Sequence, residues 1–222
     1  MLLRRETLGG QVYDLLRDRI LRGEIAGGTR LAQAPLSEEL GTSRIPVRDA
    51  LKRLENDGLI VGDDVGRYTV LEFTAADAEE IYAIRNRLEC LAIERAVQSM
   101  TAEQLAEIEA LFADLDKAAA GHDIGAFTDL NVDFHMAIYE ASGMPRLVRL
   151  IRGLWHGVPP LTPIVLAGRI DRSQHEHGEI IDSLRRRDPA GAAHALAQHI
   201  ETAGEELRES IEHQKQEPTG GK

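Results

Sequence analysis

Two arginines four residues apart stand at the start of a predicted helix. Arg44 and Arg48 share one face of that helix, because residues i and i+4 are neighbours on a helical surface. The apolar residues Val47, Leu51 and Leu54 fall on another face, at the spacing of a stripe that packs on a core. The major groove of DNA accepts a short amphipathic helix with a cationic face. The pattern favours DNA recognition; the alternative is that both arginines are solvated charges on an ordinary helix.

A second group of residues has the chemistry of metal ligands. Asn131 and His135 are four residues apart, which directs an amide oxygen and an imidazole from one helical face. His177 and His199 lie 11 residues before and after the aspartate of an Asp188-Pro189 pair, and this pair is typical of a helix start. If the flanking helices pair antiparallel, a rise of about 1.5 Å per residue brings the two imidazoles level across the hairpin.

Three imidazoles and one oxygen suit a divalent transition metal of the zinc, nickel or manganese class, with coordination positions left open. The spacing does not exclude the alternative, in which histidines beside an apolar stripe are simply packed and hydrogen bonded. The helical register is also open, and His175 replaces His177 if the register is wrong by half a turn. The other histidines are expected at the surface.

Composition indicates a globular protein of one large or two modest domains. The 222-residue chain is 43% hydrophobic and 28% charged. Its one cysteine excludes an intrachain disulfide framework and a multi-cysteine zinc site, and it fits a reducing cytoplasm. No segment is apolar enough to span a bilayer, so we expect a cytoplasmic protein without a membrane partner.

The net charge of −11 is unevenly distributed along the chain. Residues 1–73 carry 11 Lys and Arg against 12 Asp and Glu, whereas the remainder carries 15 against 25. The acidic excess therefore lies in the second part. A nearly neutral first part with clustered arginines can still bind DNA, with an affinity that depends on local placement and on two copies acting together.

The order of predicted elements in residues 1–72 is that of a winged helix-turn-helix domain. Helices are expected over 8–22, 35–41 and 44–57, with an extended piece at 25–31 after the first helix. Two short strands, 59–61 and 67–70, follow as a hairpin with a turn rich in Gly and Asp. Val12, Leu15, Leu16, Ile20 and Leu21 are expected on the buried side of the first helix.

Residues 73–213 are predicted to be helical almost throughout. Helices are expected near 75–98, 102–119, 124–142, 145–156, 170–187 and 189–213. The fold class is therefore mostly α, with an antiparallel six-helix bundle of effector-binding and dimerisation type after the winged domain. The polar tail 214–222 is expected to be disordered.

The first part resembles the DNA-binding domain of the GntR family, whose members are bacterial transcription regulators. The resemblance covers residues 9–70 and rests above all on the run Ser43-Arg44-Ile45-Pro46-Val47-Arg48-Asp49-Ala50-Leu51. It implies that Arg44 and Arg48 contact bases or phosphates in the major groove, and that Ser43 contacts a phosphate at the helix N-terminus.

The predicted wing adds two residues to this interface. The resemblance implies that Gly66 is the wing-tip glycine, which lets the backbone approach the minor groove. Arg67 beside it is a weaker phosphate candidate, with plain surface charge as the alternative. Ala34 occupies a position where many members carry arginine, so one contact is missing and we expect a different operator sequence.

The second part is similar to the FCD ligand-binding domain of the FadR subfamily, in its smaller, six-helix, VanR-type variant. The matching segments are Phe134-His135, Ala141-Ser142-Gly143, Arg187-Asp188 and Ala197-Gln198-His199. The resemblance strengthens the prediction of a metal held by Asn131, His135, His177 and His199. Many members carry aspartate at the place of Asn131, so this site has one negative charge fewer and is expected to bind metal more weakly.

The same resemblance implies a small carboxylate effector beside the metal. Arg85 matches an arginine that faces the cavity in the family and is the candidate carboxylate clamp. The alternative is an Arg85 that lies at the surface or pairs with Glu89.

We therefore predict a ligand-responsive transcription regulator without catalytic activity. It would bind a pseudo-palindromic double-stranded operator as a homodimer, with repression relieved by effector as the commoner arrangement. Two other classes remain open: a metal-dependent hydrolase, in which open metal positions activate water, and a protein-interaction module built on the acidic helical bundle.

Overall fold

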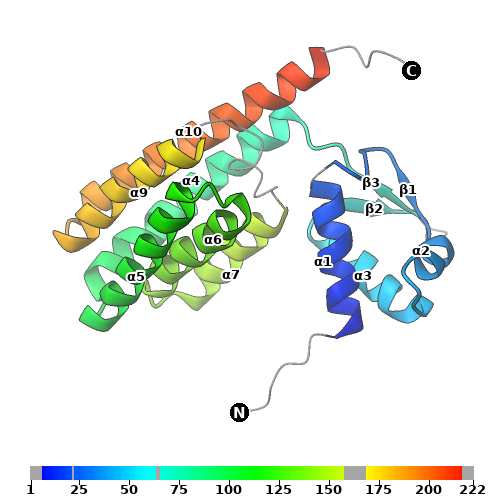
Figure 1. Cartoon of the computed structure of the whole chain (residues 1–222), viewed down its shortest axis with the longest axis horizontal. Coiled ribbons are helices and arrows are strands. Elements are labelled where there is room, and N and C mark those ends of the chain that lie inside the picture. Colours follow the sequence, from blue (N-terminus) through cyan, green and yellow to red (C-terminus); the bar gives the residue numbers. More distant parts are fainter. Residues whose placement is uncertain (1–6, 22, 64–65, 158–168, 217–222) are drawn as a thin grey trace. The chain divides into compact units, whose positions relative to one another are not determined.

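The computed structural model describes residues 7–21, 23–63, 66–157 and 169–216. The chain divides into two compact units, with the division between Phe73 and Thr74 (Figure 1). The first unit contains three helices and a small sheet among its described residues, and the second is helical.

The first unit is a winged helix-turn-helix. Its elements are α1 (Leu8–Leu21), β1 (Arg30–Leu31), α2 (Gln33–Glu39), α3 (Arg44–Asn56), β2 (Ile60–Gly62) and β3 (Tyr68–Val70). The strands form an antiparallel sheet in the order β1-β3-β2, in which Thr69 of β3 pairs with Arg30 on one side and Val61 on the other. The predicted winged domain is thus confirmed, with a third strand supplied by the expected extended piece.

The helical core of this unit follows the predicted stripes with one exception. Val47, Leu51 and Leu54 of α3 are fully buried, as the spacing predicted. On α1, however, Leu15 is 46% exposed and Tyr13 is buried instead. Tyr13 can take the inward position because its hydroxyl donates a hydrogen bond to Asp57 Oδ2 at 2.5 Å, which satisfies the polar end of a buried ring.

The second unit is built from α4 (Ala75–Ser99), α5 (Ala102–Ala120), α6 (Ile124–Glu140), α7 (Pro145–Gly157), α9 (Arg169–Arg185) and α10 (Pro189–Gln216). Side-chain caps define several helix starts. Thr74 and Asp77 form a reciprocal capping box at α4, and Thr101 and Gln104 form another at α5. Asp123 accepts from the backbone of Ala126 at the start of α6.

Predicted helix bounds in this unit are right to within a few residues, and the differences have local causes. Helix α9 ends at Arg185, two residues earlier than expected, because Arg187 adopts a left-handed φ of 53° that ends the helix. Helix α10 continues to Gln216, three residues into the predicted disordered tail. The rest of that tail lies outside the described residues.

Helix α10 lies along both α4 and α9 (Figure 1). The short turn between α9 and α10 makes them an antiparallel pair, as predicted, and the Asp188 carboxylate caps α10 by accepting from the backbone of Gly191 at 3.0 Å. Within the described part of the chain, no helix is long and apolar enough to cross a membrane.

Candidate functional site

The start of α3 presents its two arginines to solvent. Arg44 and Arg48 are exposed, on the side of α3 opposite its buried stripe. The Arg48 guanidinium lies 3.6 Å from the carboxylate of Asp49, a weak contact between two half-exposed groups. Ser43 is the N-cap residue, and its exposed hydroxyl makes no capping hydrogen bond within the chain. The cationic face that DNA recognition requires is therefore accessible.

The wing carries the other two predicted contacts. Gly66 has a φ of +78°, a left-handed conformation that favours glycine. Arg67 is exposed, but its Nε donates to Asp63 Oδ2 at 2.8 Å, while its backbone N donates to Asp63 Oδ1. The acidic partner reduces the net positive charge that Arg67 can offer to a phosphate.

Three of the predicted metal ligands converge inside the second unit. His135 of α6, His177 of α9 and His199 of α10 are all buried, and their ligand atoms lie within 4.8 Å of one another. The Nε2 atoms of His135 and His177 are 3.2 Å apart. The ring centroids of His177 and His199 are 4.8 Å apart, as the antiparallel hairpin predicted. His175 is exposed, so the alternative register is wrong.

The fourth predicted ligand, Asn131, sits one helical turn before His135 on α6. Its side-chain oxygen is buried and, among the described residues, has no hydrogen-bond partner. A buried acceptor without a donor is costly and rare in folded proteins. An orphaned oxygen one helical turn from His135 is the kind of group that a cation could satisfy.

Each imidazole of the cluster turns its Nδ1 to an oxygen atom of a neighbouring side chain. The partners are Glu176 Oε2 at 2.7 Å for His199, Tyr139 Oη at 3.3 Å for His135, and Gln174 Oε1 at 3.5 Å for His177. The Nε2 atoms point inward, although Ser173 Oγ also lies 3.4 Å from Nε2 of His177.

Burial favours the neutral form of these histidines. It lowers the pKa of His135 and of His177 well below the ordinary range, and the neighbouring imidazoles lower both further. Burial also lowers the pKa of His199, against the opposing effect of the hydrogen bond that its Nδ1 donates to Glu176. Neutral imidazole is the form that binds metal, so the cluster is suited to a cation at neutral pH.

Arg85, the predicted effector clamp, is buried and already paired. Its Nε donates to Glu89 Oε1 at 2.7 Å, which is the pairing that the sequence left open as an alternative. Its guanidinium also lies 4.5 Å from the ring centre of Trp155 and 4.7 Å from that of Tyr82. Glu89 is fully buried and accepts from Trp155 Nε1 at 2.8 Å as well.

The structure adds residues around the cluster that the sequence did not single out. Arg169 is only 1% exposed and forms a two-bond pair with Glu176, the partner of His199. Tyr139 links His135 to Glu89. The helical spacing of Glu89 with Arg85 and Ala92 could have placed it on the inward face of α4. No periodicity in the sequence, however, reveals which carboxylate is linked to which histidine.

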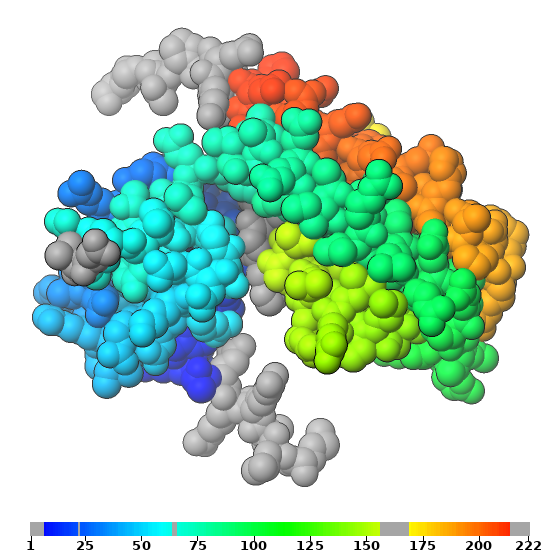
Figure 2. Space-filling model, turned by 180° about the vertical axis from the view of Figure 1, so that it is seen from behind, coloured from blue at the N-terminus to red at the C-terminus, as the bar shows by residue number. Residues whose placement is uncertain are grey.

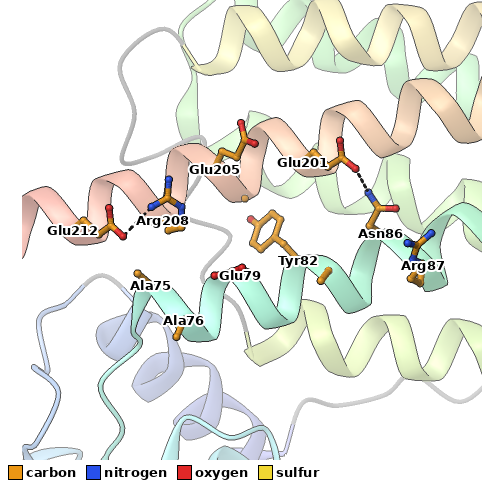
Figure 3. Close-up of a pocket in the computed structure, with 12 residues that line it drawn as sticks. Ala75, Ala76, Glu79, Tyr82, Asn86, Arg87, Glu201, Glu205, Arg208 and Glu212 are labelled. Carbon is orange, nitrogen blue, oxygen red and sulfur yellow. Dashed lines mark hydrogen bonds and ion pairs between the residues drawn. The ribbon is translucent and has the colours of Figure 1, made fainter.

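A groove of about 860 Å³ lies elsewhere on the second unit, between α4 and α10 (Figure 3). Tyr82 packs against Gly204, where an added Cβ would come within 2.8 Å of the ring. Acidic side chains predominate along its walls, and two of them bond to neighbours: Glu201 to Asn86 and Glu212 to Arg208. None of the predicted site residues lines this groove.

Comparison with known proteins supports both halves of this architecture. The family model described as bacterial regulatory proteins, gntR family, matches residues 8–67. The model of the FCD domain matches residues 80–202, more than half of the chain.

Similar full-length proteins are transcription regulators. The chain is 31% identical to the HTH-type transcriptional regulator McbR of Escherichia coli K12 over 200 residues, which cover 88% of this chain and 90% of McbR. It is 26% identical over 214 residues to the HTH-type transcriptional repressor RspR of the same organism, covering 92% and 90% of the two chains. The solved structure of E. coli McbR/YncC matches with a TM-score of 0.75 and 28% identity, over 93% of this chain and 98% of that one.

A winged helix-turn-helix unit followed by an all-helical domain defines a DNA-binding transcription regulator. The chain belongs to the GntR family of bacterial regulatory proteins, and its second unit is an FCD domain. The Ser-Arg-x-Pro-Val-Arg run had indicated the gntR family, and the histidine pattern had indicated the FCD domain.

Proposed function

We propose that this regulator is a homodimeric repressor of the FadR type, whose affinity for a pseudo-palindromic operator changes when a small carboxylate binds beside a metal in the FCD domain. The observation that carries the proposal is the convergence of His135, His177 and His199, three buried imidazoles contributed by three helices. The exposed Arg44 and Arg48 of α3 supply the DNA contacts.

The geometry of the cluster supports a resident divalent transition metal. Two nitrogen ligands about 2.0–2.1 Å from one metal, at tetrahedral or octahedral angles, are about 2.8–3.4 Å apart. The 3.2 Å between the Nε2 atoms of His135 and His177 fits that spacing. We propose the Asn131 oxygen as the fourth ligand. A metal held there would supply a Lewis-acidic positive charge with positions open to an anion.

The surroundings of the cluster argue against the hydrolase alternative. Hydrolysis at a metal needs a general base that can take a proton from water. The two carboxylates next to the cluster, Glu89 and Glu176, are each bonded to a buried arginine. Ion pairing stabilises the charged carboxylate and makes it a poor base, whereas a cation flanked by neutralised pairs retains its attraction for an anionic ligand.

The α4–α7 surface is the proposed dimer interface. Ile84 and Leu91 of α4 are seven residues apart and 41% and 42% exposed, and Leu150 of α7 is 61% exposed. Figure 2 shows α4 and α7 side by side on one face, and the Trp155–Glu89 hydrogen bond joins the two helices. Exposed leucine and isoleucine at this spacing are typical of a helix that packs against a partner.

The charges on α4 suit a two-fold partner. If two copies of α4 pack antiparallel about a point between Arg87 and Leu88, Ile84 meets the partner's Leu91. The same register sets the exposed Glu80 opposite the partner's Arg95. A self-complementary pattern of this kind favours a second copy of the chain over an unrelated protein.

Removing either α3 arginine should weaken operator binding. A duplex enriched from a random library by the wild-type protein serves as the operator in an electrophoretic shift assay. Arg44→Ala and Arg48→Ala are each expected to lose about 1–3 kcal/mol, roughly 5- to 150-fold in affinity. Arg185→Ala, which removes an exposed arginine from the second unit, is the control. Sequence-specific binding that survives both α3 changes contradicts the assignment.

Metal binding should depend on the buried histidines and not on their exposed neighbour. We expect one metal per chain by elemental analysis, lost in His177→Ala and retained in His175→Ala. Asn131→Asp should raise the affinity, because it adds a negative charge at the proposed ligand. The only tryptophan, Trp155, has its ring centre 5.3 Å from that of His135, so nickel or cobalt titration should quench its fluorescence. Equal metal content in the two histidine variants excludes this site.

Effector binding should require the metal. Thermal shift of the metal-loaded full chain against small mono- and dicarboxylates should find stabilising ligands, and chelation should abolish their effect. The effective ligands should change operator affinity about 5- to 150-fold. Carboxylate binding that is unchanged by chelation places the effector elsewhere.

We also propose Arg85 as a second contact to the carboxylate effector. Arginine has five N–H donors, and the bond to Glu89 uses only the Nε–H, so the other two nitrogens can still donate.

A charge on the α4–α7 surface should separate the dimer. Leu91→Glu and Ile84→Glu are each expected to shift the mass measured by light scattering from two chains toward one, because both copies would bury the new carboxylate. Ile124→Glu is the matched control, since Ile124 is an exposed apolar residue of the same unit, at the start of α6. An unchanged dimer mass in both α4 variants would mean that the interface lies elsewhere.

A further inference from the structure

On the outward side of the histidine cluster, the Nδ1 atoms have hydrogen-bond partners that metal binding at the Nε2 atoms does not by itself explain. His199 Nδ1 lies 2.7 Å from Glu176 Oε2, and a carboxylate oxygen can only accept. The proton of the neutral imidazole is therefore on Nδ1, and Nε2 carries a lone pair. In a neutral histidine, the partner of one ring nitrogen decides the state of the other.

Glu176 does not hold this position alone. The two terminal nitrogens of Arg169 donate to its two oxygens, at 3.2 Å to Oε1 and 3.0 Å to Oε2. This bidentate arrangement fixes the plane of the carboxylate as well as its place. Arg169 is itself almost completely buried, and its Nε lies 3.3 Å from Glu206 Oε2. An arginine balanced by two carboxylates leaves Glu176 little freedom to turn away from His199.

His135 is oriented through a hydroxyl. Tyr139 has one hydroxyl proton and donates it to Glu89 Oε2 at 2.5 Å. Its oxygen can then only accept from His135 Nδ1, 3.3 Å away. Glu89 is held in turn by Arg85 and Trp155 on its other oxygen. The two relays come from different helices, and each connects an imidazole to a carboxylate held by a buried arginine; the hydroxyl of Tyr139 lies between the two groups only in the His135 relay.

We propose that Glu176, held by Arg169, is a positioning residue that keeps the proton of His199 on Nδ1 and so presents Nε2 to the cluster. Tyr139 and Glu89 have the same role for His135. The inference rests on the proposed metal site for its purpose, but the protonated nitrogen can be observed without any metal. It also gives Arg85 a structural role, as the anchor of Glu89, independent of effector binding.

The decisive measurement is the protonated nitrogen of each histidine in the metal-free full chain. Long-range proton–nitrogen correlation spectra at pH 8 distinguish the two neutral forms, and His199→Gln and His135→Gln assign the signals. We expect Nδ1–H for both residues in the wild type. Glu176→Ala should move His199 toward Nε2–H and leave His135 unchanged, whereas Tyr139→Phe should do the reverse. Arg172→Gln is the control on α9, because Arg172 pairs with Glu206 and not with Glu176.

Zinc titration of the same proteins supplies a second readout. Loss of an outer partner of a metal-bound histidine costs about 10- to 100-fold in affinity, so we expect that loss for Glu176→Ala and Tyr139→Phe and no loss for Arg172→Gln. Tyr139→Phe preserves the packing of a buried ring, so it tests the inference even if Glu176→Ala fails to fold.

The outcomes separate this inference from the metal proposal. Nε2–H on His199 or His135 in the wild type overturns the positioning role, and so does an Nδ1 proton on both histidines that survives both changes. The expected proton shifts in a protein that binds no zinc support the positioning role and overturn the metal site alone.

Discussion

The close approach of three buried imidazoles is the constraint on which the second unit depends. The Nε2 atoms of His135 and His177 are 3.2 Å apart, a distance at which either a metal ion or a single N–H hydrogen can lie between two neutral rings. Burial lowers the pKa of both histidines and so favours neutral rings, the form that binds metal. The packing of helices α6, α9 and α10 thus holds three imidazoles close together, in an arrangement that suits the proposed metal.

The electrostatics around the cluster follow from this arrangement. Buried charges are costly unless they are paired, and here the buried Glu89 pairs with Arg85, while the partly buried Glu176 pairs with the buried Arg169. The pairs cancel, so the immediate surroundings of the cluster contribute little net charge. A divalent ion held by the three imidazoles would then be the dominant charge at the cluster, which would suit the proposed anionic effector.

The first unit differs from the second in that its functional groups are exposed and its core is apolar. The stripe of Val47, Leu51 and Leu54 anchors α3 in the winged domain and leaves Arg44 and Arg48 outward. Two exposed arginines on a nearly neutral domain offer few contacts to DNA. In the proposed dimer, two such domains would bind together, so the α4–α7 surface would matter to operator recognition as much as the arginines do.

Local patterns were enough to predict much of this protein. Helix caps, apolar periodicity and the Gly- and Asp-rich turn predicted the winged domain and the six helices, because these signals act within a few residues. The spacing about Asp188 also predicted that His177 and His199 lie level across the hairpin, since a tight hairpin relates distance along the chain to distance in space. The family resemblance added His135 to this pair, but only the tertiary structure decided that the three rings turn toward one another, that Arg85 pairs with Glu89, and that Arg169 holds Glu176. Those contacts depend on helix rotation and on the packing of side chains from separate helices, and no sequence period encodes either.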